Sequence, residues 1–377
     1  MKRDSGASIR VYNLAKGLFQ LGNEVKVIIP SEAASVERID GIEVNHIRGF
    51  LPTSFLNFFR KFVGVSRPTA LYFYDFVFIL RSARLLKKVD VVQIEQQTAG
   101  ALFAIFIRRV LKKPVVLDCH DVFQAIRVKH TSFVRKVMET FQEKLAYKFA
   151  SLILTVSETE KNVLLSYGVD SSKIESISNG VDTDFFKGQV ENNDVREKYD
   201  LGNSQVVVFV GNMEYLPNRE AVEFLSSSIV PKVLDKIKNV KFLVVGKTSQ
   251  MKKPSNLIFT GLIDDVSKVL AISDVAVAPL SQGSGTRLKI VEYFSSGLPV
   301  VSTSIGAEGL EYTDEVNIII ADNADRFSSA IVRLLKDKDL RINMGIAART
   351  VARDKYDWQI LSKHLNEVIK DTISENA

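Results

Sequence analysis

Three ionisable side chains stand close together in the segment GSGTRLKIVE (283–292), namely Arg287, Lys289 and Glu292. They follow a glycine-rich loop at the predicted start of a helix, where outward-pointing backbone N–H groups favour an anion. Glycines at 283 and 285 let a phosphate approach the backbone, and the two cations add positive charge. Glu292 is placed to accept hydrogen bonds from two ribose hydroxyls. This pattern indicates a nucleotide site, although a helix start with solvated charges explains it equally well.

The spacing within this segment limits which side chains can act together. Lys289 and Glu292 are three residues apart and share one face of the helix. Arg287 is about 200° round from Lys289 if both are helical. We therefore expect Arg287 to reach the same ligand only from the first turn or from the loop.

A second group of reactive side chains is found in VLDCHD (116–121), where a strand delivers Asp118, His120 and Asp121 to its carboxyl end. A histidine near two carboxylates can transfer a proton or hold a sugar hydroxyl. A loop histidine satisfied by local hydrogen bonds is the alternative. In VFVGNMEYLPN (208–218) a strand runs into a single glycine, Gly211, and a polar turn. The dinucleotide fingerprint GxGxxG is absent there, and no P-loop occurs in the chain.

The elements that position these groups are short apolar runs alternating with helical segments, which is typical of βα units and parallel sheets. The first half offers strands at 25–29, 91–94, 114–119, 152–157 and 174–178, with helices at 8–22 and 132–149. The second half offers strands at 205–211, 240–246, 257–261, 275–280, 299–304 and 317–320. Ligands bind beyond the carboxyl ends of such strands, and two such domains facing each other would form a cleft.

The composition fits a folded chain of 377 residues, with 46% hydrophobic and 25% charged residues, which predicts two domains. A single cysteine, Cys119, excludes an internal disulfide and favours a reducing compartment. The polar start MKRDSGASIR predicts no secretory signal, and no apolar run is long enough to span a membrane.

The charge is unevenly distributed, since residues 51–150 hold 17 basic against 7 acidic residues. Phe, Leu and Ile are interleaved with these cations in 50–65 and 103–114. We find no nucleic-acid-binding motif, so an anionic membrane surface is the favoured partner. A core-facing helix with a solvated basic side is the alternative.

The assembled motifs resemble the retaining, nucleotide-sugar-dependent glycosyltransferases of family 4 (glycosyl transferases group 1). The resemblance runs from about residue 5 to 365 and is most specific in GSGTRLKIVEYFSSGLPVVSTSIGAEGL (283–310). VGNMEYLPN (210–218), VSETE (156–160), SNGVDTDFF (178–186) and FTGLIDDV (259–266) match in order. It implies a GT-B fold, with two Rossmann-like doubly wound α/β domains, a central cleft and a C-terminal helix crossing back to the first domain.

The domains expected from the motifs are an acceptor-binding domain at 1–186, a linker at 187–204, a donor-binding domain at 205–356 and the crossover helix at 357–377. The family's first strand normally precedes the SGAS loop, and this chain begins almost at that loop. We therefore expect either a truncated start or a first sheet that lacks a central strand.

The resemblance also implies site residues, carried over position by position. Glu292 matches the second glutamate of the family's E-x7-E signature, which holds the ribose, while Ser284 replaces the first glutamate. His120 matches the histidine near the transferred sugar. Arg287 and Lys289 are expected to stabilise the leaving diphosphate. The remaining expected contacts are Gly211, Asn212, Gly283, Gly285 and Thr286 on the donor side, and Ser5 and Gly6 on the acceptor side.

The function implied is transfer of a hexosyl group from a nucleoside diphosphate sugar to a saccharide or lipid-linked acceptor, without a cofactor or metal. The expected setting is surface polysaccharide or glycolipid synthesis in the cytoplasm, at the inner face of the plasma membrane. A non-catalytic glycosyltransferase-like subunit, and an epimerase of the same fold, are the alternatives. Nucleoside diphosphate binding would separate the enzyme from the scaffold.

Overall fold

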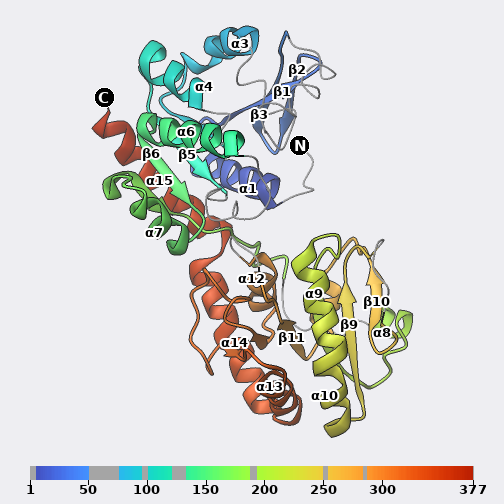
Figure 1. The fold of residues 1–377 in the computed structure, drawn as a ribbon. Helices are drawn as coiled ribbons and strands as arrows, with labels where there is room; N and C mark the ends of the chain where they lie inside the picture. The colour runs from blue at the N-terminus through green and yellow to red at the C-terminus, as the bar shows by residue number, and fades with distance from the viewer. Residues whose placement is uncertain are drawn as a thin grey trace. The chain divides into compact units, whose positions relative to one another are not determined.

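The structure is a computed structural model that describes residues 6–50, 76–95, 101–120, 133–186, 193–248, 254–282 and 287–376 (Figure 1). The chain forms two compact units. Unit 1 consists of residues Met1–Ser178 and Leu361–Ala377, and unit 2 consists of residues Asn179–Ile360. Among the helices of the described ranges, none is both long enough and apolar enough to cross a bilayer.

Unit 1 holds two separate sheets among its described residues. The strands are β1 (Lys26–Ser31), β2 (Ser35–Ile39) and β3 (Ile42–Arg48) in the order β1-β3-β2, and β4 (Val92–Ile94), β5 (Val115–Cys119), β6 (Leu152–Thr155) and β7 (Ile174–Ser176) in the order β4-β5-β6-β7. Every pair is parallel except β2 with β3. The carboxyl ends of β4 and β5 therefore meet at one edge, where Glu95 and His120 follow them.

Helices cover both faces of the four-stranded sheet of unit 1. The helical elements are α1 (Gly6–Gln20), α3 (Phe76–Leu86), α4 (Ala101–Phe106), η2 (a π-helical turn, Ile107–Leu111), α6 (Phe133–Phe149), α7 (Glu158–Ser166), η3 (a 3-10 turn, Ser171–Lys173) and α15 (Trp358–Glu375), whose first three residues belong to unit 2. Val115, Leu117 and Cys119 face one core with α3, α4 and α6. The alternate residue Asp118 faces α1 on the other side, because successive strand side chains point to opposite faces.

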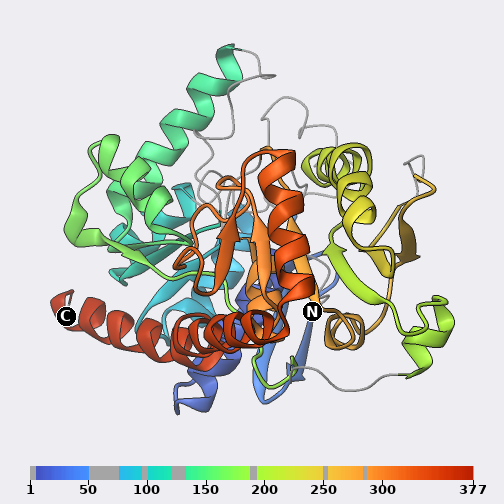
Figure 2. The same ribbon diagram turned by 90° about the horizontal axis from the view of Figure 1, so that it is seen from below.

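The C-terminal helix α15 packs on α1 (Figure 2). A Cβ added at Gly17 of α1 would lie 2.0 Å from the Ser362 hydroxyl oxygen. The Asn23 amide donates to the Asn366 side-chain oxygen over 2.9 Å. This close approach explains why the last residues of the chain belong to unit 1.

Unit 2 is a six-stranded parallel sheet with helices on both faces. Its strands are β8 (Gln205–Val210), β9 (Val240–Val245), β10 (Ile258–Gly261), β11 (Val275–Ala278), β12 (Val300–Ser302) and β13 (Ile318–Ile320), in the order β10-β9-β8-β11-β12-β13. Its helices are α8 (Asn193–Lys198), α9 (Leu216–Phe224), η4 (a π-helical turn, Leu225–Ile229), α10 (Val230–Lys236), α11 (Ser267–Ala271), α12 (Leu288–Ser295), α13 (Ala324–Lys336) and α14 (Lys338–Lys355). The order reverses at β8 and β11, where ligands bind in sheets of this type.

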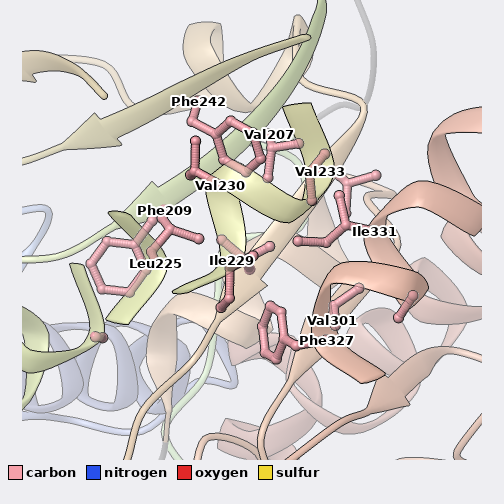
Figure 3. Close-up of a cluster of buried hydrophobic side chains, with 14 of the residues drawn as sticks. Val207, Phe209, Leu225, Ile229, Val230, Val233, Phe242, Val301, Phe327 and Ile331 are labelled. Atoms are coloured by element: carbon pink, nitrogen blue, oxygen red, sulfur yellow. The ribbon is translucent and has the colours of Figure 1, made fainter. Parts of the chain in front are cut away.

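The strands of unit 2 alternate between two cores, which fixes their register. Val207 and Phe209 of β8 pack with Leu225, Ile229, Phe327 and Ile331 (Figure 3). Val206 and Val208 point to the opposite face and pack with Ile290, Phe294 and Ala348. With both faces buried, the strands read as continuous apolar runs, which is why the sequence predicted them.

The predicted strands are all present, but two features differ from expectation. The hairpin of β2 and β3 was not predicted, although Asp40-Gly41 between alternating residues is a hairpin signal. The predicted linker at 187–204 is not where the chain divides. Val181, Phe186 and Leu201 are buried in the second core of unit 2, so the boundary falls after Ser178 instead.

Two glycines at the carboxyl ends of β8 and β9 allow the chain to pass at close range. A Cβ at Gly246, whose φ is +132°, would lie 2.0 Å from the Gly211 carbonyl oxygen. That neighbour is backbone and cannot rotate away. The close approach therefore depends on glycine at position 246.

We expect Gly246→Ala to lower the free energy of unfolding of unit 2 by about 2–4 kcal/mol, because it adds a backbone clash to an unfavourable φ. Gly202→Ala is the matched control, since Gly202 also has a positive φ (+49°) but nothing within 4 Å of an added Cβ. It should cost only about 1 kcal/mol. Urea unfolding measures both, and equal losses would contradict the steric argument.

Candidate functional site

The predicted anion-binding segment lies at the start of α12, next to the carboxyl ends of β8, β11 and β12. Arg287 is the N-cap residue of α12 and has a non-helical backbone (φ −79°, ψ 73°). Arg287 therefore lies at the junction of loop and helix, the position that the sequence analysis required if Arg287 is to reach the same ligand as Lys289. Residues 283–286, which hold Gly283, Ser284, Gly285 and Thr286, lie outside the described residues.

Lys289 connects α12 to α9, the helix that follows β8. Its Nζ donates to Asn218 Oδ1 over 2.7 Å and lies 4.2 Å from the centroid of the Phe209 ring. The Asn218 amide in turn donates to the Asn212 carbonyl oxygen over 2.9 Å. The ammonium group is therefore held against an aromatic face and an amide, and no carboxylate of the described residues is bonded to it.

Gly211 makes room for this arrangement. A Cβ added there would lie 2.9 Å from the side-chain carbon and nitrogen of Asn218. The preceding residue, Val210, is the last residue of β8. Its N–H donates to the Tyr293 hydroxyl of α12 over 2.7 Å. Three predicted donor-side residues, Gly211, Asn212 and Lys289, are thus brought together by Asn218.

The charges of Lys289 and Glu292 are poorly solvated. Burial, followed by the like charge of Arg287, lowers the pKa of Lys289 to about 7. Burial raises the pKa of Glu292 to about 7, against the opposing effect of the Lys289 charge. Both side chains therefore change charge near neutral pH, and a bound anion would favour their protonated forms.

Arg287 contacts the loop after β12. One of its terminal nitrogens donates to the Ile305 carbonyl oxygen over 3.3 Å, and the same nitrogen lies 3.9 Å from a Glu308 carboxylate oxygen. Burial lowers the pKa of the guanidinium, and Glu308 counteracts it. An arginine nevertheless stays charged at neutral pH, so this end of α12 carries a fixed cation that is 7% exposed.

A second polar group lies in unit 1, at the carboxyl ends of β4 and β5. Arg10 of α1 donates from Nε to Asp118 Oδ2 over 2.9 Å and from a terminal nitrogen to Oδ1 over 3.1 Å. Another terminal nitrogen donates to the Ser178 carbonyl oxygen over 2.9 Å. Both side chains of this ion pair are fully buried, so each charge depends on the other.

His120 lies beside this ion pair. Its Nε2 is 2.8 Å from Glu95 Oε2. Burial alone would lower the pKa of His120, but the hydrogen bond to Glu95 and the charges of Asp118 and Glu95 raise it above its ordinary value. Among the described residues, the histidine expected from the sequence is thus near two carboxylates, Glu95 and Asp118.

Of the other predicted acceptor-side residues, Gly6 is the first residue of α1, while Ser5 and Asp121 lie outside the described residues. Sequence reasoning missed Arg10, Gln93, Glu95 and Asn218 as parts of these groups. Arg10 had a detectable signal: it shares the apolar face of its helix with Leu14, four residues on. Glu95 had none, because its partner His120 follows the neighbouring strand, 25 residues away in the sequence.

The two α/β units with parallel sheets have the GT-B fold. Two family models match the chain, "Glycosyltransferase Family 4" over residues 5–185 and "Glycosyl transferases group 1" over residues 204–337. The chain belongs to the family 4 glycosyltransferases. It is therefore a glycosyltransferase that uses nucleotide-sugar donors.

Similar proteins agree with this assignment. The chain is 29% identical over 278 residues to the UDP-Gal:alpha-D-GlcNAc-diphosphoundecaprenol alpha-1,3-galactosyltransferase of Escherichia coli, covering 69% of this chain and 70% of that one. It is 25% identical to the phosphatidyl-myo-inositol mannosyltransferase of Mycobacterium leprae, covering 76% and 75%. Among solved structures, Anabaena HepE in complex with UDP and glucose has a TM-score of 0.71 at 16% identity, covering 98% of this chain and 97% of that one.

We expect Asp118→Ala to lower the free energy of unfolding by about 3–5 kcal/mol, because it leaves the Arg10 guanidinium buried without a counter-charge. Replacing both partners together (Arg10→Met with Asp118→Leu) should cost clearly less. Glu24→Ala is the control, since it breaks an ion pair of 2.6 Å in which Glu24 is 80% exposed, and solvent screening should leave stability almost unchanged. Urea denaturation measures these changes, and similar losses for Asp118→Ala and Glu24→Ala would contradict the burial argument.

Proposed function

We propose that this enzyme transfers a sugar from a nucleoside diphosphate to a hydroxyl of a saccharide or lipid-linked acceptor, with retention of configuration, in surface polysaccharide or glycolipid synthesis. The observation that carries this proposal is the pair of cations at the start of α12, Arg287 and Lys289, held beside the carboxyl end of β8. The Escherichia coli relative is named for a diphosphoundecaprenol-linked acceptor, and the Mycobacterium leprae relative for phosphatidyl-myo-inositol. These names support a lipid-linked acceptor.

The proposed role of the two cations is to stabilise the leaving diphosphate. Negative charge develops on that group as the sugar bond breaks, so fixed positive charges help the transition state more than the ground state. The pKa of Lys289, about 7, rises when an anion binds beside it, and the ammonium form then predominates. Backbone amides of Gly283, Ser284, Gly285 and Thr286 are proposed to complete the contact, with Gly211 and Asn212 lining the approach. Glu292 is proposed to hold the ribose.

On the acceptor side, His120 is proposed to hold a hydroxyl of the transferred sugar, with Ser5 and Gly6 near the acceptor. We propose that no metal takes part. The group Glu95, Asp118 and His120 has ligand atoms within 4.8 Å of one another, as a metal site would require. However, Arg10 donates to both oxygens of Asp118, and this buried guanidinium would repel a cation. The chemistry of the donor set therefore favours a hydrogen-bond network.

The proposed function is tested first through donor binding. UDP, GDP and their sugars are screened by thermal shift, and the correct nucleotide sugar should raise the melting temperature by several degrees at about 100 times its Kd. Its affinity should fall between pH 7 and pH 9, because Lys289 loses its proton above its pKa of about 7. Lys289→Met should weaken binding, flatten this pH dependence and lower kcat on the order of 10²-fold.

The matched control is Lys336→Met, since Lys336 lies in the last turn of α13, is exposed, and has no part in the proposed site. It should behave as the unaltered enzyme. The anomeric configuration of the product, read by NMR, tests retention. Inverted product would contradict retention alone, whereas failure to bind any nucleotide sugar would overturn the donor assignment.

We also propose that unit 1 docks on an anionic membrane. Helix α3 and turn η2 pack together. The segments 76–88 and 101–113 hold eight basic residues and no acidic one. Leu80 and Val110 are exposed beside these cations, by 48% and 64%. Phe103, Ala104 and Ile107 instead face the core, so only part of the segment 103–114 is available. The other segment, 50–65, falls almost entirely outside the described residues.

We expect the protein to sediment with vesicles of anionic phospholipid at low salt and to be released at about 1 M salt. Reversing three exposed charges (Lys87→Glu, Lys88→Glu and Lys112→Glu) should lower binding at least tenfold, because each cation contributes about 1 kcal/mol near the surface. The control carries three reversals in unit 2, at Lys336, Lys338 and Arg353, which are also exposed. If both variants lost vesicle binding equally, net charge alone would explain the binding, and docking through unit 1 would be contradicted.

A further inference from the structure

The polar group at the carboxyl ends of β4 and β5 contains a carboxylate with no role in the function proposed above. Glu95 follows β4 directly, and His120 follows β5 in the neighbouring strand. We propose that Glu95 is a positioning residue of the acceptor-side site, which fixes His120 through Nε2 so that Nδ1 is presented to a sugar hydroxyl. This inference rests on the proposed function through the role of His120.

Both oxygens of Glu95 are committed, which fixes the orientation of the carboxylate. Oε2 accepts from His120 Nε2–H over 2.8 Å. Oε1 accepts from the Gln93 amide over 2.8 Å. The same amide nitrogen lies 3.3 Å from Asp118 Oδ2. A carboxylate held at both ends orients its partner, and it is poorly placed to attack a sugar carbon as a nucleophile.

The support for Glu95 continues back to the buried ion pair. Asp118 receives two hydrogen bonds from Arg10, so its Oδ2 is a fixed acceptor for Gln93. The series Arg10, Asp118, Gln93, Glu95 and His120 therefore joins α1, β5 and β4. Each member restricts the next, which is what a precisely placed binding group requires.

The arrangement determines which nitrogen of His120 meets a ligand. Because Nε2 is occupied by Glu95, the neutral ring carries its proton on Nε2 and leaves Nδ1 as an acceptor for a substrate O–H. When the ring is protonated, Nδ1–H donates to the hydroxyl oxygen. Within the described parts of the chain, no residue forms a hydrogen bond to Nδ1. His120 and Glu95 side chains are 19% and 30% exposed, so the pair is reachable from solvent.

Other Glu–His pairs in unit 1 provide an internal comparison. His46 Nε2 lies 3.0 Å from Glu37, and His364 Nε2 lies 3.0 Å from Glu175. The second of these joins α15 to β7 and lies among exposed groups. In the part of the chain that the structure describes, the His364–Glu175 pair is not joined to a buried ion pair. Glu175→Gln is therefore a matched control that removes the same kind of contact elsewhere in the same unit.

The first test measures the titration of the histidine ring signals by NMR in the full chain, without substrate. The groups that face His120 are Glu95 from β4, Asp118 from β5 and Arg10 from α1. Glu95→Gln removes a negative charge that raises the pKa of His120, while the opposing effect of burial remains, so the pKa of His120 should fall. Glu175→Gln should leave the His120 titration unchanged. An unchanged pKa of His120 in Glu95→Gln would overturn the proposal, provided that the melting temperature shows a folded protein.

The second test measures transfer as a function of pH. Glu95→Gln should lower kcat/KM on the order of ten- to a hundredfold and move the acid limb of the profile by the same shift seen for His120. Glu95→Asp, which keeps the charge, should restore the position of the limb. If Glu95→Gln shifts the titration but leaves the pH profile and KM unchanged, Glu95 does not position a substrate-binding group. If the unaltered enzyme transfers no sugar but Glu95→Gln still shifts the titration of His120, the proposed function is contradicted. The coupling between Glu95 and His120 would then still stand.

Discussion

The buried ion pair between Arg10 and Asp118 is the constraint on which the acceptor-side architecture depends. Both side chains are fully buried, so neither charge is tolerable without the other. The pair ties the first helix to the centre of the four-stranded sheet, and through the Ser178 carbonyl it also fixes the segment where unit 1 ends. Gln93, Glu95 and His120 take their positions from it. The polar group at the ends of β4 and β5 is thereby joined to α1 by one interaction across 108 residues of sequence.

The donor-side group of unit 2 is governed by the opposite electrostatic situation. There Lys289 bonds to the neutral Asn218 amide, and Glu292 is held in surroundings that disfavour its anion. Such groups cost stability in the empty protein and interact strongly with a ligand that supplies the missing charge. The two polar groups therefore differ in their charge balance. The buried charges of Arg10 and Asp118 neutralise each other, whereas the group around Lys289 is proposed to be neutralised by a bound anion.

Much of the fold and part of the site were predictable, for reasons that particular residues make clear. Strands such as 205–210 and 240–245 are buried on both faces and therefore appear as unbroken apolar runs. The start of α12 was identifiable because glycines and charges adjoin it in the sequence. Glu95 and Asn218 were not identifiable, because their roles depend on contacts across 25 and 71 residues. The boundary after Ser178 was missed because Val181 and Phe186 join a core formed mostly by later residues.

The division of the chain has a consequence for its folding during synthesis. Unit 2 is one continuous stretch, whereas unit 1 needs the last helix, which packs where Gly17 leaves room for Ser362. Because chains emerge from the ribosome amino end first, the middle of this protein can finish folding while its beginning still waits for the final residues. A chain that stopped before Leu361 would contain all of unit 2, but its first unit would lack the helix that packs on α1.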